Sequence, residues 1–294
     1  EKYKKLNKQN YFFFKGKIQS KLLIKKILKT RKIHTIVHLA SESHVDRSIE
    51  KPFEFIKQNI ISTTSLYSSI KELLKEEKIL NPNIIHISTD EVFGSITKKS
   101  ASESHTFFPN SPYSASKAST ENIARSFVET YGLKISIVRL CNNYGPYQFP
   151  EKFIPTCILN SINSKSIPIY GHGKNVREWM HVLDSCRALE TIMNNFENKV
   201  NYNIGSNVTF TNLQIIKTLK KVLKKNIVVN HVFDRPGHDL RYSLNSNKFR
   251  KKFNWKPKYS FKEGLEKTIK WYKKNNSWIK DTLKNYQGER IGKL

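Results

Sequence analysis

Residues 84–91 read Ile-Ile-His-Ile-Ser-Thr-Asp-Glu, an apolar run that ends in two hydroxyls and two carboxylates. A short run of β-branched residues is typical of a strand that is buried on both faces. Similar runs occupy residues 33–39 and 135–140. We predict helices over the intervening residues 52–74 and 112–131, because each stretch begins with a proline that suits a first helical turn. Strands and helices therefore alternate along this part of the chain.

This alternation predicts an α/β fold, in which right-handed crossovers join parallel strands into a doubly wound sheet covered by helices on both faces. Ligands of such sheets bind at the carboxyl ends of the strands. Each predicted strand is followed there by a polar cluster, at residues 38–44, 88–91 and 141–146. We therefore predict a cleft at this edge of the sheet. Further along, residues 202–205 indicate another short strand and residues 213–222 an amphipathic helix.

The composition excludes several classes of protein. The 294 residues include 52 Lys and Arg against 24 Asp and Glu, and the resulting net charge of +28 favours anionic ligands. With 38% hydrophobic and 12% aromatic residues, the chain is not a disordered polycation. The lysines are spread through nearly every segment without a stripe of stacking aromatics, so we expect no nucleic-acid binding. No apolar run approaches the ~18 residues of a membrane span, so we expect no membrane partner.

Cysteine usage bears on metal binding and on the cellular compartment. The three cysteines, Cys141, Cys157 and Cys186, are odd in number and form no CxxC pair. Such a set provides neither a disulfide framework nor a zinc site. We therefore expect no metal and a cytoplasmic location, where thiols stay reduced.

Tyr113 and Lys117 are the first candidates for catalysis. They lie four residues apart on the helix predicted to begin at Pro112, so their side chains share one face. A lysine ammonium beside a phenol stabilises the phenolate and lowers the pKa, which makes tyrosine a usable base. The spacing alone is weak evidence, because Tyr67 and Lys71 have it too. Only Tyr113 follows a strand that carries its own polar tip.

That tip, Thr89-Asp90-Glu91, has two interpretations. The structural one is an Asx turn that caps the next segment. In the functional one, Thr89 hydrogen-bonds a substrate oxygen while the two carboxyls divide acid and base work. Two carboxyls in one cleft repel each other, so one keeps its proton at neutral pH while its neighbour is ionised.

Structural explanations also exist for other polar residues. His38 and His86 lie inside the strand-like runs, where histidines with satisfied hydrogen bonds are common. Arg177 precedes a glutamate, an arrangement typical of a surface ion pair that contributes little to stability. His44 and Asp46 are suited to capping the helix that follows them.

Four longer stretches together resemble the dTDP-glucose 4,6-dehydratases, a family of extended short-chain dehydrogenase/reductases. They are LASESHVDRS at 39–48, STDEVFG at 88–94, SPYSASK at 111–117 and NNYGP at 142–146. The similarity continues in order through nearly the whole chain, at residues 150–152, 177–179, 202–205, 234–239 and 254–257. The resemblance implies a Rossmann-like doubly wound parallel sheet, truncated at its N-terminus, with a smaller C-terminal α/β substrate domain. It also implies an NAD-dependent lyase of deoxysugar biosynthesis that forms a homodimer.

The resemblance also implies residue roles, with NAD as the cofactor. Tyr113, helped by Lys117 and Thr89, would take the proton of the sugar 4-hydroxyl. Glu91 would remove the C5 proton and Asp90 would protonate the departing C6 hydroxyl, so that dTDP-glucose becomes dTDP-4-keto-6-deoxyglucose. The implied NAD contacts are Ile18, Leu39, Ala40, Ser41, Asn59, Ser88, Tyr113, Lys117 and Cys141. The implied nucleotide-sugar contacts are Ser43, His44, Asn142, Asn143, Lys152, Arg177, Asn212, Arg235 and His238.

One family feature is missing from the sequence. No GxxGxxG turn, whose backbone amides hold the pyrophosphate of NAD, occurs before Ile33, and Gly16 stands alone. We expect an enzyme truncated at its N-terminus, with the fragment itself inactive. The alternatives are a non-catalytic sugar-nucleotide binder and a UDP-glucose 4,6-dehydratase. The expected domains are residues 1–146 and 178–205 for NAD, and residues 147–177 and 206–294 for the sugar nucleotide.

Overall fold

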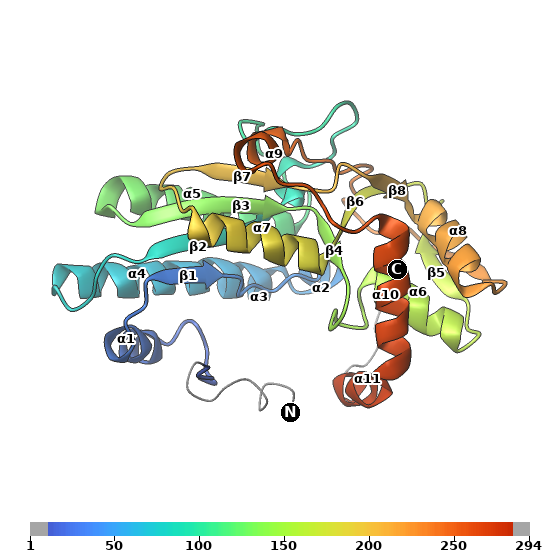
Figure 1. The fold of residues 1–294 in the computed structure, drawn as a ribbon, viewed down its shortest axis with the longest axis horizontal. Coiled ribbons are helices and arrows are strands. Elements are labelled where there is room, and N and C mark those ends of the chain that lie inside the picture. Colours follow the sequence, from blue (N-terminus) through green and yellow to red (C-terminus); the bar gives the residue numbers. More distant parts are fainter. Residues whose placement is uncertain (1–10, 285–294) are drawn as a thin grey trace.

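A computed structural model of the chain describes residues 11–284. Its central sheet has four strands in the order β1-β2-β3-β7, and all neighbouring strands are parallel. These strands are β1 (Thr35–His38), β2 (Asn83–Thr89), β3 (Lys134–Leu140) and β7 (Asn201–Ile204). Figure 1 shows the sheet between layers of helices. The predicted α/β class, the three predicted strands and the short strand near residue 202 are therefore confirmed, although β1 lies at the edge of the sheet and is only partly buried.

Helices cover both faces of this sheet. They are α1 (Lys21–Thr30), α4 (Ser62–Lys75), α5 (Pro112–Tyr131), α7 (Val182–Asn194) and α9 (Asn247–Phe253). Side chains alternate along a strand, so Ile84 of β2 packs with α4 and α5 on one face, whereas Ile85 packs with α7 and α9 on the other. This two-sided burial explains why the strands read as continuous apolar runs.

The helix predicted over residues 52–74 is present but is interrupted. It consists of α3 (Pro52–Ile56), a π-helical turn η2 (Lys57–Ile61) and α4. Such a turn inserts an extra residue into the helical repeat and is frequent at functional sites. Here it buries Asn59, whose side chain accepts a hydrogen bond from the Glu42 amide at 2.7 Å and donates one to Ser116 Oγ at 2.8 Å. Asn59 thereby ties the segment after β1 to α5.

The bounds predicted for α5 are confirmed, and capping explains both ends. Ser111 Oγ accepts a hydrogen bond from the Ser114 amide at 3.1 Å, and Ser114 Oγ accepts one from the Ser111 amide at 3.0 Å. Gly132 ends the helix in the left-handed conformation, with φ of 68°. Tyr113 therefore lies in the first turn of α5, next to the carboxyl end of β2.

A second, smaller group of elements lies at the right of Figure 1. Its strands are β4 (Asn142–Tyr144), β6 (Val176–His181) and β8 (Thr209–Thr211) in one sheet, and β5 (Ile167–Tyr170) and β9 (Val229–Val232) in another. Its helices are α6 (Phe153–Ile162), α8 (Asn212–Leu223), α10 (Phe261–Lys274) and α11 (Asn276–Leu283). Trp271, Tyr272 and Trp278 belong to the core of this group, and the helix predicted over residues 213–222 is α8.

A buried ion pair joins the sheet to α5. Arg139 of β3 is the largest fully buried side chain among the residues that the structure describes. It donates to Glu121 of α5 from Nε at 2.9 Å and from Nη2 at 2.6 Å. Its Nη1 also donates to the carbonyl of Glu103 at 3.2 Å, and its guanidinium lies 4.9 Å from the ring centre of Phe93. A charge in this position is retained only when it is paired and hydrogen-bonded. The pair therefore fixes α5 relative to β3.

The two buried histidines of the sheet have hydrogen-bond partners, as expected for core residues. His38 Nε2 lies 3.0 Å from Thr63 Oγ1. His86 Nδ1 lies 2.8 Å from the hydroxyl of Tyr67, and its Nε2 lies 3.2 Å from Thr120 Oγ1. Burial lowers the pKa of His38 to about 4, so this ring is neutral at physiological pH.

We expect the protein to lose stability as the pH falls from 6.5, the ordinary pKa of histidine, towards about 4. In that window the unfolded chain binds a proton at His38 that the folded protein excludes, so the free energy of unfolding decreases as the pH falls. Urea denaturation at neutral and mildly acidic pH measures this slope. His38→Gln should reduce the slope, whereas His34→Gln, at an exposed position, should leave it unchanged. If the free energy of unfolding depended equally on pH in both variants, His38 would not be the source of the acid sensitivity.

Candidate active site

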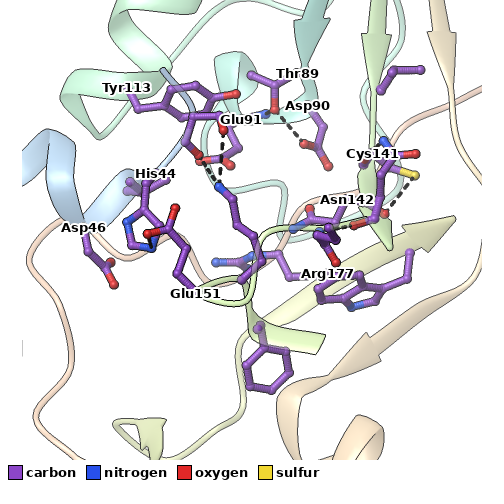
Figure 2. Close-up of a pocket in the computed structure, with 18 of the residues that line it drawn as sticks. His44, Asp46, Thr89, Asp90, Glu91, Tyr113, Cys141, Asn142, Glu151 and Arg177 are labelled. Atoms are coloured by element: carbon purple, nitrogen blue, oxygen red, sulfur yellow. Dashed lines mark hydrogen bonds and ion pairs between the residues drawn. The ribbon is translucent and has the colours of Figure 1, made fainter. Parts of the chain in front are cut away.

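The carboxyl ends of β1, β2 and β3 border one cavity of about 470 Å³. Leu39 follows β1, Asp90 and Glu91 follow β2, and Cys141 follows β3. Arg177 of β6 belongs to the opposite wall, which the second group of elements provides. Figure 2 shows Asp90, Glu91, Cys141 and Arg177 around the pocket. The polar clusters predicted to form a cleft are therefore brought together.

Most of the predicted site residues line this cavity. They are Leu39, Ser43, His44, Ser88, Thr89, Asp90, Glu91, Tyr113, Cys141, Asn142, Asn143, Lys152, Arg177, Asn212, Arg235 and His238. The predicted residues outside the lining are Ile18, Ala40, Ser41, Asn59 and Lys117. Ile18 packs against the apolar core that α4 and α5 form on one face of the sheet. Asn59 accepts a hydrogen bond from the amide of Glu42, in the segment after β1.

Asp90 and Glu91 begin a single 3-10 turn, η3 (Asp90–Phe93), directly after β2. Thr89 Oγ1 accepts a hydrogen bond from the Glu91 amide at 3.3 Å and donates one to Asp90 Oδ1 at 3.1 Å. Thr89 therefore caps this turn, as the structural interpretation expected. Asp90 Oδ2, by contrast, is buried and finds no hydrogen-bond partner among the described residues. Thr89 thus caps the turn η3, and Asp90 presents one carboxyl oxygen without a hydrogen-bond partner at the cavity.

The surroundings of the two carboxyls differ. Burial, together with the charges of Glu91 and Glu178, raises the pKa of Asp90 well above its usual range. Burial also raises the pKa of Glu91, but the nearby charges of Arg235 and Arg177 oppose this rise. Asp90 is therefore the group that holds its proton more firmly, and Glu91 is the one that ionises more readily.

Tyr113 lies beside the acid pair, and its amide donates to Ser48 Oγ at 3.2 Å. Burial, aided by the charge of Glu91, raises the pKa of its phenol. Lys117 Nζ donates to the carbonyl of Ile87 at 2.7 Å, and burial lowers its pKa to about 8. The expected lowering of the Tyr113 pKa is wrong for this arrangement, because the ammonium of Lys117 is bound to the strand backbone.

The opposite wall of the cavity is cationic. Arg177 donates from Nη2 to the carbonyl of Asp239 at 2.9 Å, and Lys152 Nζ donates to the carbonyl of Ser43 at 2.6 Å. Burial lowers the pKa of both cations. Buried cations of this kind bind carboxylate and phosphate groups through charge-assisted hydrogen bonds. The wall also contains Arg235 and His238.

The surface ion pair suggested for Arg177 and the following glutamate is wrong. Arg177 and Glu178 are both buried, and successive residues of a strand such as β6 point to opposite faces. Glu178 accepts hydrogen bonds from the amides of Asn207 at 2.7 Å and Leu244 at 2.8 Å. It therefore ties two loops to β6, which leaves Arg177 to face the cavity.

Sequence reasoning missed part of the lining. The missed residues are Val45, Asp46, Ile87, Leu140, Gln148, Glu151, Phe153, Pro168, Tyr170 and Trp179. Glu151 pairs with Arg47 at 2.7 Å and lies 3.7 Å from His44 Nε2. His44 also caps α2 (Val45–Glu50) by accepting the Arg47 amide at its Nδ1, so its structural role is confirmed. The signal that could have identified Glu151 was its position directly before Lys152.

Two other kinds of site receive no support from residues 11–284. Within this range, no helix combines the length and the apolar character needed to cross a membrane. The same residues contain no cluster of three or more His, Cys, Asp or Glu side chains arranged to hold a metal ion.

Comparison with known proteins places the chain in a family. A family model for GDP-mannose 4,6 dehydratase matches residues 1–268. The chain is 37% identical to the dTDP-glucose 4,6-dehydratase of Escherichia coli over an alignment 312 residues long, gaps included. The alignment covers 97% of this chain and 86% of that protein. The chain belongs to the dTDP-glucose 4,6-dehydratase family. The resemblance inferred from its motifs is therefore confirmed.

Solved structures of dTDP-glucose 4,6-dehydratases have the same fold. DesIV from Streptomyces venezuelae, crystallised with NAD bound, is 40% identical with a TM-score of 0.86, and the match covers 91% of this chain and 81% of that one. The Bacillus anthracis enzyme in complex with NAD is 38% identical with a TM-score of 0.84, and the match covers 94% and 84% of the two chains. The Rossmann-like fold expected for a dTDP-glucose 4,6-dehydratase is therefore present.

Proposed function

We propose that this protein dehydrates dTDP-glucose to dTDP-4-keto-6-deoxyglucose with NAD as its cofactor. The observation that carries the proposal is the convergence of Tyr113, Asp90 and Glu91 on one cavity with a cationic opposite wall. The reaction needs three proton transfers at neighbouring sugar carbons, and a phenol with two carboxyls of different proton affinity provides the groups for them. Family membership supports the same reaction.

The residues at the strand ends fit the nicotinamide half of NAD. Ser88 Oγ is buried and finds no hydrogen-bond partner in the described part of the chain, and the exposed Leu39 adds apolar surface at the same edge of the sheet. A polar group beside an apolar surface suits a flat ring attached to a ribose. When bound, NAD accepts a hydride from C4 of the sugar and returns it to C6. The residues proposed to hold it are Leu39, Ser88, Tyr113 and Cys141 in the cavity lining, and Ile18, Ala40, Ser41, Asn59 and Lys117 outside that lining.

Tyr113 is proposed to accept the proton of the 4-hydroxyl. Burial raises the pKa of its phenol, and the nearby hydroxyl of Thr89 opposes that rise. Further stabilisation of the phenolate requires a cation, and Lys117 lies one helical turn further along α5. Lys117 would have to exchange the carbonyl of Ile87 for the phenol to supply it.

Glu91 and Asp90 are proposed to act at C5 and C6. A carbonyl at C4 acidifies the hydrogen on C5, which Glu91 removes as a general base. The charges of Arg177 and Arg235 favour the carboxylate form that this step needs. Asp90, which holds its proton because of burial, protonates the C6 hydroxyl so that it departs as water.

The cationic wall is proposed to bind the diphosphate of the substrate. Arginine forms paired hydrogen bonds with phosphate oxygens, and a buried site strengthens them. The residues proposed for this role are Lys152, Arg177, Arg235 and His238. Those proposed to contact the sugar and nucleoside are Ser43, His44, Asn142, Asn143 and Asn212.

Incubation of the chain with NAD and dTDP-glucose tests the proposal. We expect the alkali-induced absorbance of a 4-keto sugar from a form extended at its N-terminus by a family GxxGxxG segment, and a slower reaction with UDP-glucose as the matched substrate. Absence of the ketone, both from this chain and from a form extended at its N-terminus by a family GxxGxxG segment, would contradict the proposal. Calorimetric binding of dTDP without binding of NAD would instead favour a non-catalytic sugar-nucleotide binder.

Three further properties are proposed with this function. The NAD domain is residues 1–146 and 178–205, and the sugar-nucleotide domain is residues 147–177 and 206–294, although residues 1–10 and 285–294 lie outside the described part.

A homodimer is supported by the exposed apolar side chains of Phe53, Ile56 and Ile61 on α3 and η2, which association of two copies would bury. A cytoplasmic location is supported by the thiols of Cys141 and Cys186. Sedimentation analysis tests the dimer.

A further inference from the structure

Asp46 of α2 connects the two walls of the cavity. Its side chain is buried, and both of its carboxylate oxygens accept hydrogen bonds from the second group of elements. Oδ1 accepts from Nη1 of Arg235 at 3.0 Å, and Oδ2 accepts from the hydroxyl of Tyr170 at 2.8 Å. Asp46, Tyr170 and Arg235 all line the cavity, and Figure 2 shows Asp46 beside His44 at its edge. One carboxylate therefore holds two residues of the opposite wall.

The guanidinium of Arg235 is fixed at one edge only. Its Nε is buried and has no hydrogen-bond partner among residues 11–284, whereas its Nη1 is bound to Asp46. The N–H groups of a guanidinium are arranged in a rigid plane, so fixing one of them sets the direction of the others. Burial alone would raise the pKa of Asp46, but the charge of Arg235 and the hydrogen bond of Tyr170 lower it below its usual range. The pair is therefore ionised.

A carboxylate at this place needs a physical reason. A negative charge repels a diphosphate, so Asp46 weakens the long-range attraction of the cationic wall for such a ligand. Any favourable contribution of Asp46 to ligand binding must therefore come from how it places Arg235 and Tyr170, and not from direct attraction of the ligand. We propose that Asp46 is a positioning residue, which orients Arg235 and Tyr170 so that the free edge of the guanidinium faces the diphosphate of the nucleotide sugar. This inference rests on the proposed function and goes beyond it by assigning a residue that does not itself bind the substrate.

Asp46→Asn separates the two effects because they have opposite signs. The substitution keeps the size of the side chain and an acceptor for Tyr170, but it removes the charge that holds Arg235. Loss of repulsion alone would tighten the binding of dTDP. Loss of orientation weakens it, and since the paired hydrogen bonds between a guanidinium and a phosphate depend on geometry, we expect the orientation effect to dominate.

Calorimetry with dTDP and steady-state kinetics with dTDP-glucose provide the measurements. For Asp46→Asn we expect dTDP to bind about 10-fold more weakly and KM to rise by about the same factor, while kcat changes by less than about 2-fold. Glu50→Gln, which removes the same charge from an exposed position of α2, should leave the affinity for dTDP within about 2-fold. Unchanged or tighter binding of dTDP to Asp46→Asn would overturn the inference.

A double variant shows whether Asp46 acts through Arg235. In an Arg235→Ala background, Asp46→Asn should lose most of its effect on dTDP affinity, because the residue it orients is absent. Full additivity of the two substitutions would overturn the inference as well. Failure of the proposed function has a different signature, since wild-type protein would then leave dTDP-glucose unchanged while Asp46→Asn still weakened dTDP binding.

Discussion

Glu91→Gln should reduce formation of the 4-keto-6-deoxy product by about 10²–10⁴-fold. The amide cannot accept the C5 proton, and this range is the usual contribution of a positioned general base. The size and polarity of the side chain are kept, so dTDP affinity measured by calorimetry should stay within about 2-fold of wild type. A product rate near that of wild type would show that Glu91 is not the base.

Exchange of the C5 hydrogen with solvent deuterium distinguishes the two carboxyls. Asp90→Asn should also lose product formation, because an amide cannot protonate the departing C6 hydroxyl. It should nevertheless retain C5 exchange, since Glu91 still removes that proton. Glu91→Gln should lose both. Exchange that survives in Glu91→Gln but not in Asp90→Asn would reverse the two assignments.

Arg139→Leu should lower the free energy of unfolding by about 3–5 kcal/mol. The substitution leaves the carboxylate of Glu121 fully buried without its counter-ion, and breaking a buried pair from one side has this cost. Urea denaturation at neutral pH measures it. Arg125→Leu, at an exposed position of α5, is the matched control and should change the free energy of unfolding by less than about 0.5 kcal/mol.

The double variant Arg139→Leu with Glu121→Leu tests the cause of that loss. Replacing both members of a buried ion pair by apolar residues is often close to neutral, so we expect the double variant to be more stable than Arg139→Leu alone. If the two losses simply added, the instability would arise from packing around Arg139 rather than from an unpaired charge.

Local sequence patterns were sufficient to predict the sheet and α5. The apolar runs of β2 and β3 are buried on both faces, and α5 begins at the proline that suits its first turn, so both signals lie within a few residues. The placement of Asp90 and Glu91 at the cavity followed from the same logic, because they directly follow β2. These predictions needed no knowledge of distant contacts.

Other parts of the site depend on contacts that no local pattern contains. Asp46 and Arg235 pair across 189 residues, so Asp46 alone indicated only a helix cap. The direction of the Lys117 ammonium depends on the carbonyl of Ile87 on the neighbouring strand, which helical spacing does not reveal. The π-helical turn buries Asn59, whose hydrogen bonds to two other segments are likewise absent from any local pattern.

The pairing of Asp46 with Arg235 has a consequence for biosynthesis. Ribosomes release a chain from its N-terminus, so domains near that end begin to fold first. Helix α2, which carries Asp46, is synthesised long before Arg235, and until then Asp46 lacks the guanidinium that it binds in the folded protein. The ion pair between Asp46 and Arg235 therefore forms only after residue 235 has been synthesised.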